Sequence, residues 1–237
     1  NTAPQVAFMG DLAVFDLPCV FDSLDECREK IDDPEFYDLI SNVYTEGGYH
    51  LLGMADQGFR VMSTNKPVYS FSDFKGQKIR TMENQVHIAF WKAMGADATP
   101  MSWGEAYTAL QQGALDGQEN PATVILTNNV AQVNNHLAMT EHAYSTVFLV
   151  MSPETWASFD DETKETFKRV MAECSIEERE ISRKMDSEAV AELEKQGMTV
   201  TYPDKQQFID KAADLYAQWE EQYGDMISEI RALSVNK

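Results

Sequence analysis

The sequence predicts a mixed α/β protein of two lobes joined by one long helix. Its 237 residues, 43% of them hydrophobic, are enough for one large domain or two lobes of ordinary size. Short apolar or β-branched runs alternate with helical patterns, which is typical of strands buried between helices. Residues 154–196 contain neither proline nor glycine, and a helix of that length would be longer than a single lobe is wide.

Four short segments carry the strand pattern. Each is an apolar or β-branched run bounded by turn signals, as expected of strands buried on both faces. The predicted strands are His50–Ala55, Lys78–Thr81, Val147–Met151 and Met198–Thr201.

Two helices are predicted after the second strand. The first covers Asn84–Met94, and Gly95 follows it as a usual C-cap residue. The second opens at Ser102, where Glu105 completes the sequence of a capping box, and it ends at Gly113.

The segment without proline or glycine predicts a helix that runs along both lobes, which we call the spine helix. Some 35 residues at 1.5 Å each would span roughly 50 Å. Asp160 and Asp161 supply N-cap chemistry. An apolar stripe at helical spacing is traced by Phe167, Val170, Met171, Cys174, Ile181 and Met185. The alternative is two helices broken near Ser175.

The charge of the chain argues against several classes of partner. The formal net charge is -20, whereas nucleic acid and anionic membrane surfaces are bound by clustered lysine and arginine. No stretch approaches the roughly 20 apolar residues that a membrane-spanning helix needs. We therefore expect a globular protein that binds no nucleic acid.

Residues 58–80 form a basic segment within this acidic chain. They hold five basic residues against the single acid Asp73, a local charge of +4. A cleft with such a local charge can attract an anion despite the charge of the whole protein. We assign Lys66 and Lys75 to the solvated surface, and Arg60 and Arg80 to a candidate anion site.

The cysteines and histidines indicate neither a metal centre nor catalysis. Cys19, Cys27 and Cys174 lack CxxC spacing, so no zinc site is predicted, and a Cys19–Cys27 disulfide and unpaired thiols both remain open. The four histidines are scattered, with no HExxH or GxSxG motif among the residues around them. Glu119 has no accompanying nucleophile. We predict no enzyme activity, no cofactor and no metal.

From end to end the chain resembles the solute-binding subunit of tripartite ATP-independent periplasmic (TRAP) transporters, of the dicarboxylate-binding DctP type. The most specific motif is Leu115-Asp116-Gly117-Gln118-Glu119-Asn120-Pro121. It is supported by Gly58-Phe59-Arg60, Phe74-Lys75-Gly76-Gln77-Lys78-Ile79-Arg80, Met94-Gly95-Ala96 and Leu137-Ala138-Met139-Thr140. The resemblance implies the two-lobed periplasmic-binding-protein fold, with the spine helix spanning both lobes, and an extracytoplasmic location.

The resemblance also implies where a ligand would bind. The arginine that bridges the ligand carboxylate falls on Arg80, and an assisting arginine falls on Arg60. An aromatic or polar contact falls on Trp103 and an amide contact on Asn120. Glu83 takes a further contact position, where family members that bind sugar acids often carry an uncharged amide. Its carboxylate would accept a hydroxyl or an amine of the ligand, or pair with a neighbouring base. Trp103 could instead only pack, and Asn120 could serve only the turn before Pro121.

The implied mechanism is capture by closure of the two lobes. Lobe I would hold residues 1–57 and 146–185, and lobe II residues 58–145 and 186–237. In the family, further strand and helix units of lobe I precede the point where this chain begins. The expected partners are a small organic acid (a dicarboxylate, sugar acid, keto acid or aromatic acid) and the TRAP membrane subunits, bound by a monomer. A sensor ectodomain of the same fold is the alternative.

Overall fold

The structure, a computed structural model, describes residues 2–18, 21 and 23–232, with side chains up to residue 228. Six strands form one sheet in the order β3-β2-β4-β1-β5-β6. They are β1 (His50–Thr64), β2 (Lys78–Thr81), β3 (Asp97–Pro100), β4 (Gly117–Pro121), β5 (His136–Met151) and β6 (Thr199–Thr201). All four predicted strands are confirmed, although two of them are only the ends of β1 and β5.

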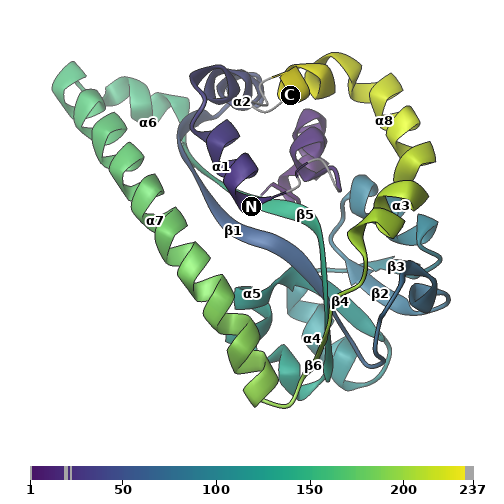
Figure 1. The fold of residues 1–237 in the computed structure, drawn as a ribbon. Coiled ribbons are helices and arrows are strands. Elements are labelled where there is room, and N and C mark those ends of the chain that lie inside the picture. The colour runs from purple at the N-terminus through teal and green to yellow at the C-terminus, as the bar shows by residue number, and fades with distance from the viewer. Residues whose placement is uncertain (1, 19–20, 22, 233–237) are drawn as a thin grey trace.

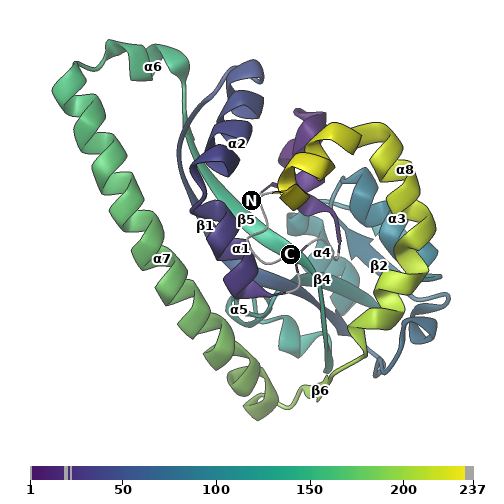
Figure 2. The same ribbon diagram turned by 45° about the horizontal axis from the view of Figure 1, so that its top comes forward.

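Eight α-helices surround the sheet in the described part of the chain. They are α1 (Leu24–Ile31), α2 (Pro34–Glu46), α3 (Gln85–Ala93), α4 (Trp103–Gln111), α5 (Ala122–Thr127), α6 (Pro153–Ser158), α7 (Asp161–Lys195) and α8 (Lys205–Ala232). Short 3-10 turns are η1 (Gln5–Ala7), η2 (Gly10–Asp16), η3 (Phe71–Phe74) and η4 (Val130–Gln132). In Figures 1 and 2, α7 runs along one side of the molecule and α8 curves around the other, with β1 and β5 between them.

The two long strands β1 and β5 connect the two halves of the molecule. They pair antiparallel from His50 opposite Met151 to Thr64 opposite His136. β4 pairs antiparallel with the last residues of β1, and β2 lies parallel to both β3 and β4. The carboxyl ends of β2, β3 and β4 therefore meet at one edge, where open α/β sheets bind their ligands.

Separate hydrophobic cores confirm the two-lobed α/β architecture. One core joins η2, α1 and α2 to the halves of β1 and β5 near His50 and Met151. Two further cores cover the opposite faces of the sheet in the other half, since the successive residues Val61 and Met62 belong to different cores. Residues Trp219 and Ile227 of α8 pack into the first core. The predicted lobe boundaries stay a prediction.

The spine helix is the uninterrupted helix α7, so the alternative of a break near Ser175 is wrong. Its predicted apolar stripe packs on the sheet only in part: Met171 lies against Gly53 of β1, whereas Ile181 is 50% exposed and Met185 45% exposed. The buried positions are Ser175, Arg179, Ser182, Ala189 and Leu193.

A buried carboxylate explains this polar contact face. Asp56 of β1 is fully buried and accepts hydrogen bonds from Ser182 Oγ of α7 at 3.2 Å and Tyr144 Oη at 2.7 Å. Arg28 Nε donates to the same carboxylate at 2.9 Å, and its Nη2 donates to the backbone oxygen of Arg179. A buried charge needs such partners, so polar residues of α7 face the sheet here.

The predicted helix ends are largely confirmed. The side chain of Asn84 caps α3 by accepting from the amides of Val86 and His87, and Gly95 has the positive φ of 87° that favours glycine after a helix. At α4 the capping box is incomplete. Ser102 is the N-cap residue, but its hydroxyl donates to the Glu105 side chain and accepts no backbone hydrogen bond.

Of the three cysteines, Cys27 is buried and Cys174 is exposed. Cys19 is not among the described residues, so the Cys19–Cys27 pairing lies outside them. Within the described chain, no helix has both the length and the apolar character required to span a bilayer.

Candidate functional site

Four of the five predicted ligand contacts line one cavity of about 570 Å³. Arg80 lies in β2 and Glu83 just after it, Asn120 lies in β4, and Trp103 is the first residue of α4. The cavity therefore sits at the carboxyl ends of the parallel strands. Its other lining residues are Pro4, Ala7, Phe8, Gln57, Met82, Met101, Ser102 and Val124.

The guanidinium of Arg80 lies at the wall of this cavity and forms no ion pair with any residue that the structure describes. The residue is only 3% exposed, and its Nε donates to the backbone oxygen of Met101 at 2.8 Å. Its two terminal nitrogens have no hydrogen-bond partner among the described residues. Burial lowers the pKa of Arg80; the carboxylate of Glu119 opposes that shift, and Arg60 adds to it.

The other buried arginines differ from Arg80 in this respect. Arg28 forms an ion pair with Asp56, Arg60 with Glu119, and Arg179 with Asp32. Arg80 alone among the arginine side chains that the structure describes forms no ion pair there. A buried, unpaired cation is costly unless an anion joins it, so Arg80 is suited to bind an external carboxylate.

Arg60 lies behind the cavity and does not line it. It is almost fully buried, with its Nε paired to the Glu119 carboxylate and its Nη2 donating to the backbone oxygen of Glu119 at 2.7 Å. The same Nη2 donates to Asn120 Oδ1 at 3.1 Å, and Asn120 Nδ2 donates to Gln118 Oε1 at 2.6 Å. Arg60 thus holds Asn120, which lines the cavity, and the predicted part of Arg60 in ligand binding stays a prediction.

Trp103 both packs and lines the cavity. It is partly buried against the core beside α4 and α5, and its indole Nε1 donates to Asn128 Oδ1 at 3.2 Å. The guanidinium carbon of Arg80 lies 5.4 Å from the centroid of the Trp103 ring, a cation–π contact. The indole is therefore a wall of the site that also restrains Arg80.

Glu119 and two histidines form a buried polar cluster next to Arg60. His142 Nε2 lies 3.2 Å from Glu119 Oε2, and His87 Nδ1 lies 3.6 Å from Glu119 Oε1. Burial would raise the pKa of Glu119, but Arg60 and the histidines hold that pKa well below its usual value. Burial lowers the pKa of His142 to about 4, although Glu119 opposes the shift. At neutral pH Glu119 is thus the charged partner that fixes Arg60.

Several site residues were not predicted from the sequence. Gln57 and the N-terminal residues Pro4, Ala7 and Phe8 carry no local motif and reach the cavity through tertiary packing. The sequence does carry a signal for Glu119, which is the polar run Gly117–Asn120. In the structure this run lies in β4, and every residue of β4 is buried. A polar, fully buried strand implies a hydrogen-bonded network.

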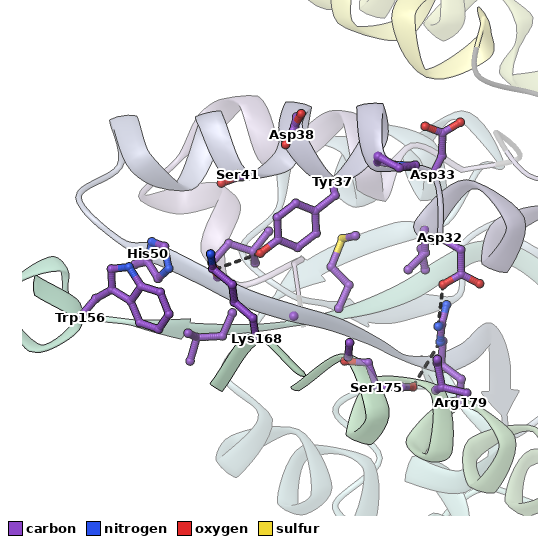
Figure 3. Close-up of a pocket in the computed structure, with 18 residues that line it drawn as sticks. Asp32, Asp33, Tyr37, Asp38, Ser41, His50, Trp156, Lys168, Ser175 and Arg179 are labelled. Carbon is purple, nitrogen blue, oxygen red and sulfur yellow. Dashed lines mark hydrogen bonds and ion pairs between the residues drawn. The ribbon is translucent and has the colours of Figure 1, made fainter. Parts of the chain in front are cut away.

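A second cavity of about 520 Å³ lies between α2, β1 and α7 (Figure 3). At one end His50 stacks on Trp156 with ring centroids 4.1 Å apart, and at the other Arg179 Nη2 pairs with Asp32 at 2.6 Å. Lys168, which also lines it, pairs with Glu165. Both cations of this cavity are already paired, so it is less suited than the Arg80 cavity to bind a carboxylate.

In the described part of the chain, no group of three or more histidine, cysteine, aspartate or glutamate side chains could hold a metal ion. The Arg80 cavity instead offers one guanidinium, amide groups from Asn120 and Gln57, and an aromatic wall.

Comparisons with known proteins show the family of the chain. The sequence profile of the family described as bacterial extracellular solute-binding protein, family 7, matches residues 4–222. A solute-binding protein of Verminephrobacter eiseniae is 35% identical over 235 residues, which cover 98% of this chain and 70% of that protein. The resemblance to the DctP type is thereby confirmed.

Solved structures share the fold over almost the whole chain. A TRAP periplasmic solute-binding protein from Polaromonas sp. JS666, bound to D-erythronate, has a TM-score of 0.92 at 32% identity, covering 99% of this chain and 77% of that one. Another from Pseudomonas putida F1, with bound D-glucuronate, has a TM-score of 0.91 at 31% identity, covering 97% and 76%. The predicted fold class is confirmed.

Proposed function

Because the chain belongs to family 7 of the bacterial extracellular solute-binding proteins, the family of TRAP-type periplasmic solute-binding proteins, we propose that Arg80 captures the carboxylate of a small organic acid. The family places the protein outside the cytoplasm, as the resemblance predicted. Its relatives are solute-binding proteins and not enzymes, so the proposed function is binding without turnover.

The observation that carries the proposal is the unpaired guanidinium of Arg80 at the cavity wall. Arginine presents a planar fork that can hold a carboxylate through two parallel hydrogen bonds, and the pair is stronger where water is excluded. Its Nε is already used by Met101, so the carboxylate would meet the two terminal nitrogens.

The cavity suits a small acid in size and composition. Its volume of about 570 Å³ lies within the usual range of ligand pockets. The ligands of the two solved relatives, D-erythronate and D-glucuronate, both carry a carboxylate. Dicarboxylates, sugar acids, keto acids and aromatic acids share that group, and Trp103 and Asn120 would contact the remainder of the molecule.

Closure of the two lobes would then enclose the ligand. We place the hinges near Gly58 and in residues 143–147, where the chain passes between the lobes along β1 and β5. Gly58 has a positive φ of 77°, and the register of β1 against β5 shifts between Asp56 and Phe59. The closed monomer would deliver the acid to the TRAP membrane subunits, with residues 1–57 and 146–185 moving against 58–145 and 186–237.

Calorimetric titration of D-erythronate and D-glucuronate into the wild type and Arg80→Ala tests the proposal. Removing one partner of a buried ion pair costs about 2–5 kcal/mol, so the variant should bind roughly 30- to 4000-fold more weakly. Arg80→Lys should restore little affinity, because lysine cannot form the fork. Arg169→Ala is the matched control, since Arg169 is exposed on α7 and pairs with Glu173.

Near-native affinity in Arg80→Ala would refute the assignment of Arg80. A thermal-shift screen of organic acids should precede the titrations, because a ligand that binds only the folded state raises its melting temperature. Delivery is tested by uptake into vesicles that contain the membrane subunits: wild type should drive accumulation of the acid and Arg80→Ala should not.

A further inference from the structure

The Arg80 cavity has a simple charge balance. Among its described lining residues Arg80 is the sole cation and Glu83 the sole carboxylate. The other polar side chains are neutral and belong to Gln57, Ser102, Trp103 and Asn120. A ligand held by its carboxylate at Arg80 therefore finds no second cation in this lining. It does find a second, protein-borne carboxylate.

Within the described residues, Glu83 has no partner that would give it a structural role. It is exposed, lies between the end of β2 and the start of α3, and has no ion pair or hydrogen bond among the described residues. The helix start does not need it, because Asn84 Oδ1 accepts from the amides of Val86 at 2.9 Å and His87 at 3.4 Å. Glu83 instead lines the cavity.

An ionised carboxylate accepts hydrogen bonds and donates none. A ligand group that meets Glu83 is favoured if it is a hydroxyl or an ammonium, and disfavoured if it is another carboxylate, because like charges repel and neither can donate. We propose that Glu83 is a specificity residue that selects monocarboxylates carrying a hydrogen-bond donor, and that it excludes dicarboxylates. This inference rests on the proposed capture of a carboxylate by Arg80.

Four acids with four carbons separate the contributions. Butyrate has one carboxylate and no donor, and succinate has a second carboxylate. D-erythronate adds hydroxyls, and 4-aminobutyrate adds an ammonium group. The wild type should bind erythronate or 4-aminobutyrate at least about tenfold more tightly than succinate, since a hydrogen bond to a charged group is worth about tenfold or more. The tighter binder of erythronate and 4-aminobutyrate shows whether Glu83 prefers a hydroxyl or an ammonium group.

Glu83→Gln tests whether Glu83 causes this preference. The neutral amide can donate to a second carboxylate, so succinate should gain about tenfold or more in affinity relative to erythronate and 4-aminobutyrate, while butyrate changes little. Glu29→Gln, which removes an exposed charge from α1 outside the cavity, should leave all four affinities unchanged. Melting curves without ligand verify that both variants fold.

The outcomes separate the two proposals. If binding depends on Arg80 but the ratio of succinate to the donor-bearing acids is the same in wild type and Glu83→Gln, the role of Glu83 is overturned and that of Arg80 stands. A wild type that prefers succinate also overturns it. If Arg80→Ala abolishes the binding of none of the four acids, both proposals fail.

Discussion

The guanidinium of Arg80 lies against the ring of Trp103, with 5.4 Å between the guanidinium carbon and the ring centroid. Together with the hydrogen bond from Nε to Met101, this contact fixes the guanidinium before any ligand arrives. A binding group that is already ordered loses less entropy when the ligand binds.

Trp103→Ala should therefore weaken acid binding. A cation–π contact contributes about 0.5–2 kcal/mol, which corresponds to a roughly 2- to 30-fold higher Kd, and Trp103→Phe should lose only part of this. Calorimetric titration with D-erythronate measures the effect. Trp156→Ala is the control, because Trp156 stacks on His50 in the other cavity. Equal losses in the two alanine variants would mean that the indole acts only through general stability.

Arg60→Met should destabilise the fold more than any surface arginine change. It leaves Glu119 buried without its counter-charge, at a cost of about 3–5 kcal/mol. Adding Glu119→Gln removes that uncompensated charge, so the double variant should recover much of the loss. Urea unfolding of the two single variants and the double variant measures this coupling. Additive losses would show that Arg60 and Glu119 do not depend on each other.

Local signals were sufficient for the ends of elements. Strand 78–81 and the stop at Gly95 follow from residue type alone, because β-branched runs and a glycine with positive φ need no distant partner. The long reach of β1 was not predictable in this way. Its middle holds Asp56 and Arg60, polar residues that become buried only through partners far along the chain.

The same limit applied to the spine helix and the site. The length of α7 could be predicted from the absence of proline and glycine. Its buried face could not, because Ser182 faces the sheet to donate a hydrogen bond to the buried carboxylate of Asp56. For the site, the family resemblance predicted four residues that line one cavity. That Arg60 would contact Asn120 instead of the cavity depends on the buried charge of Glu119, which residue spacing does not reveal.

His142 should make stability fall in mildly acid solution. Burial lowers its pKa from 6.5 to about 4, so between these values the unfolded chain binds a proton that the folded chain does not. The contribution of His142 to stability is therefore lost as pH falls from about 6.5 to about 4, by an amount on the order of 2–3 kcal/mol. The low pKa of Glu119 acts at lower pH, below its unfolded value of 4.5.

Urea unfolding at several pH values between 4.5 and 7 measures this slope, and the variant His142→Gln should flatten it. The variant will also be less stable at pH 7, because the ring packs between Phe90 and Trp91. Only the change in slope reports the proton. An unchanged slope in His142→Gln would assign the acid sensitivity to other groups.

Asp186→Asn should stabilise the protein, and only above mildly acid pH. Asp186 of α7 lies against the proposed hinge, where a Cβ on Gly58 would sit 3.2 Å from its Oδ2. Burial raises the pKa of Asp186 from 3.8 to about 6, and the backbone amide of Thr123 only partly opposes this. The folded chain thus holds a proton between these values that the unfolded chain has lost, and stability falls as pH rises through the window. Asparagine removes the charge, so we expect a gain of about 1–2 kcal/mol in the free energy of unfolding at pH 8 and little gain at pH 4.

Urea unfolding of Asp186→Asn at both pH values measures this gain, with Glu180→Gln on the exposed side of the same helix as the control. An equal gain at both pH values would mean that relief of the buried charge is not its cause.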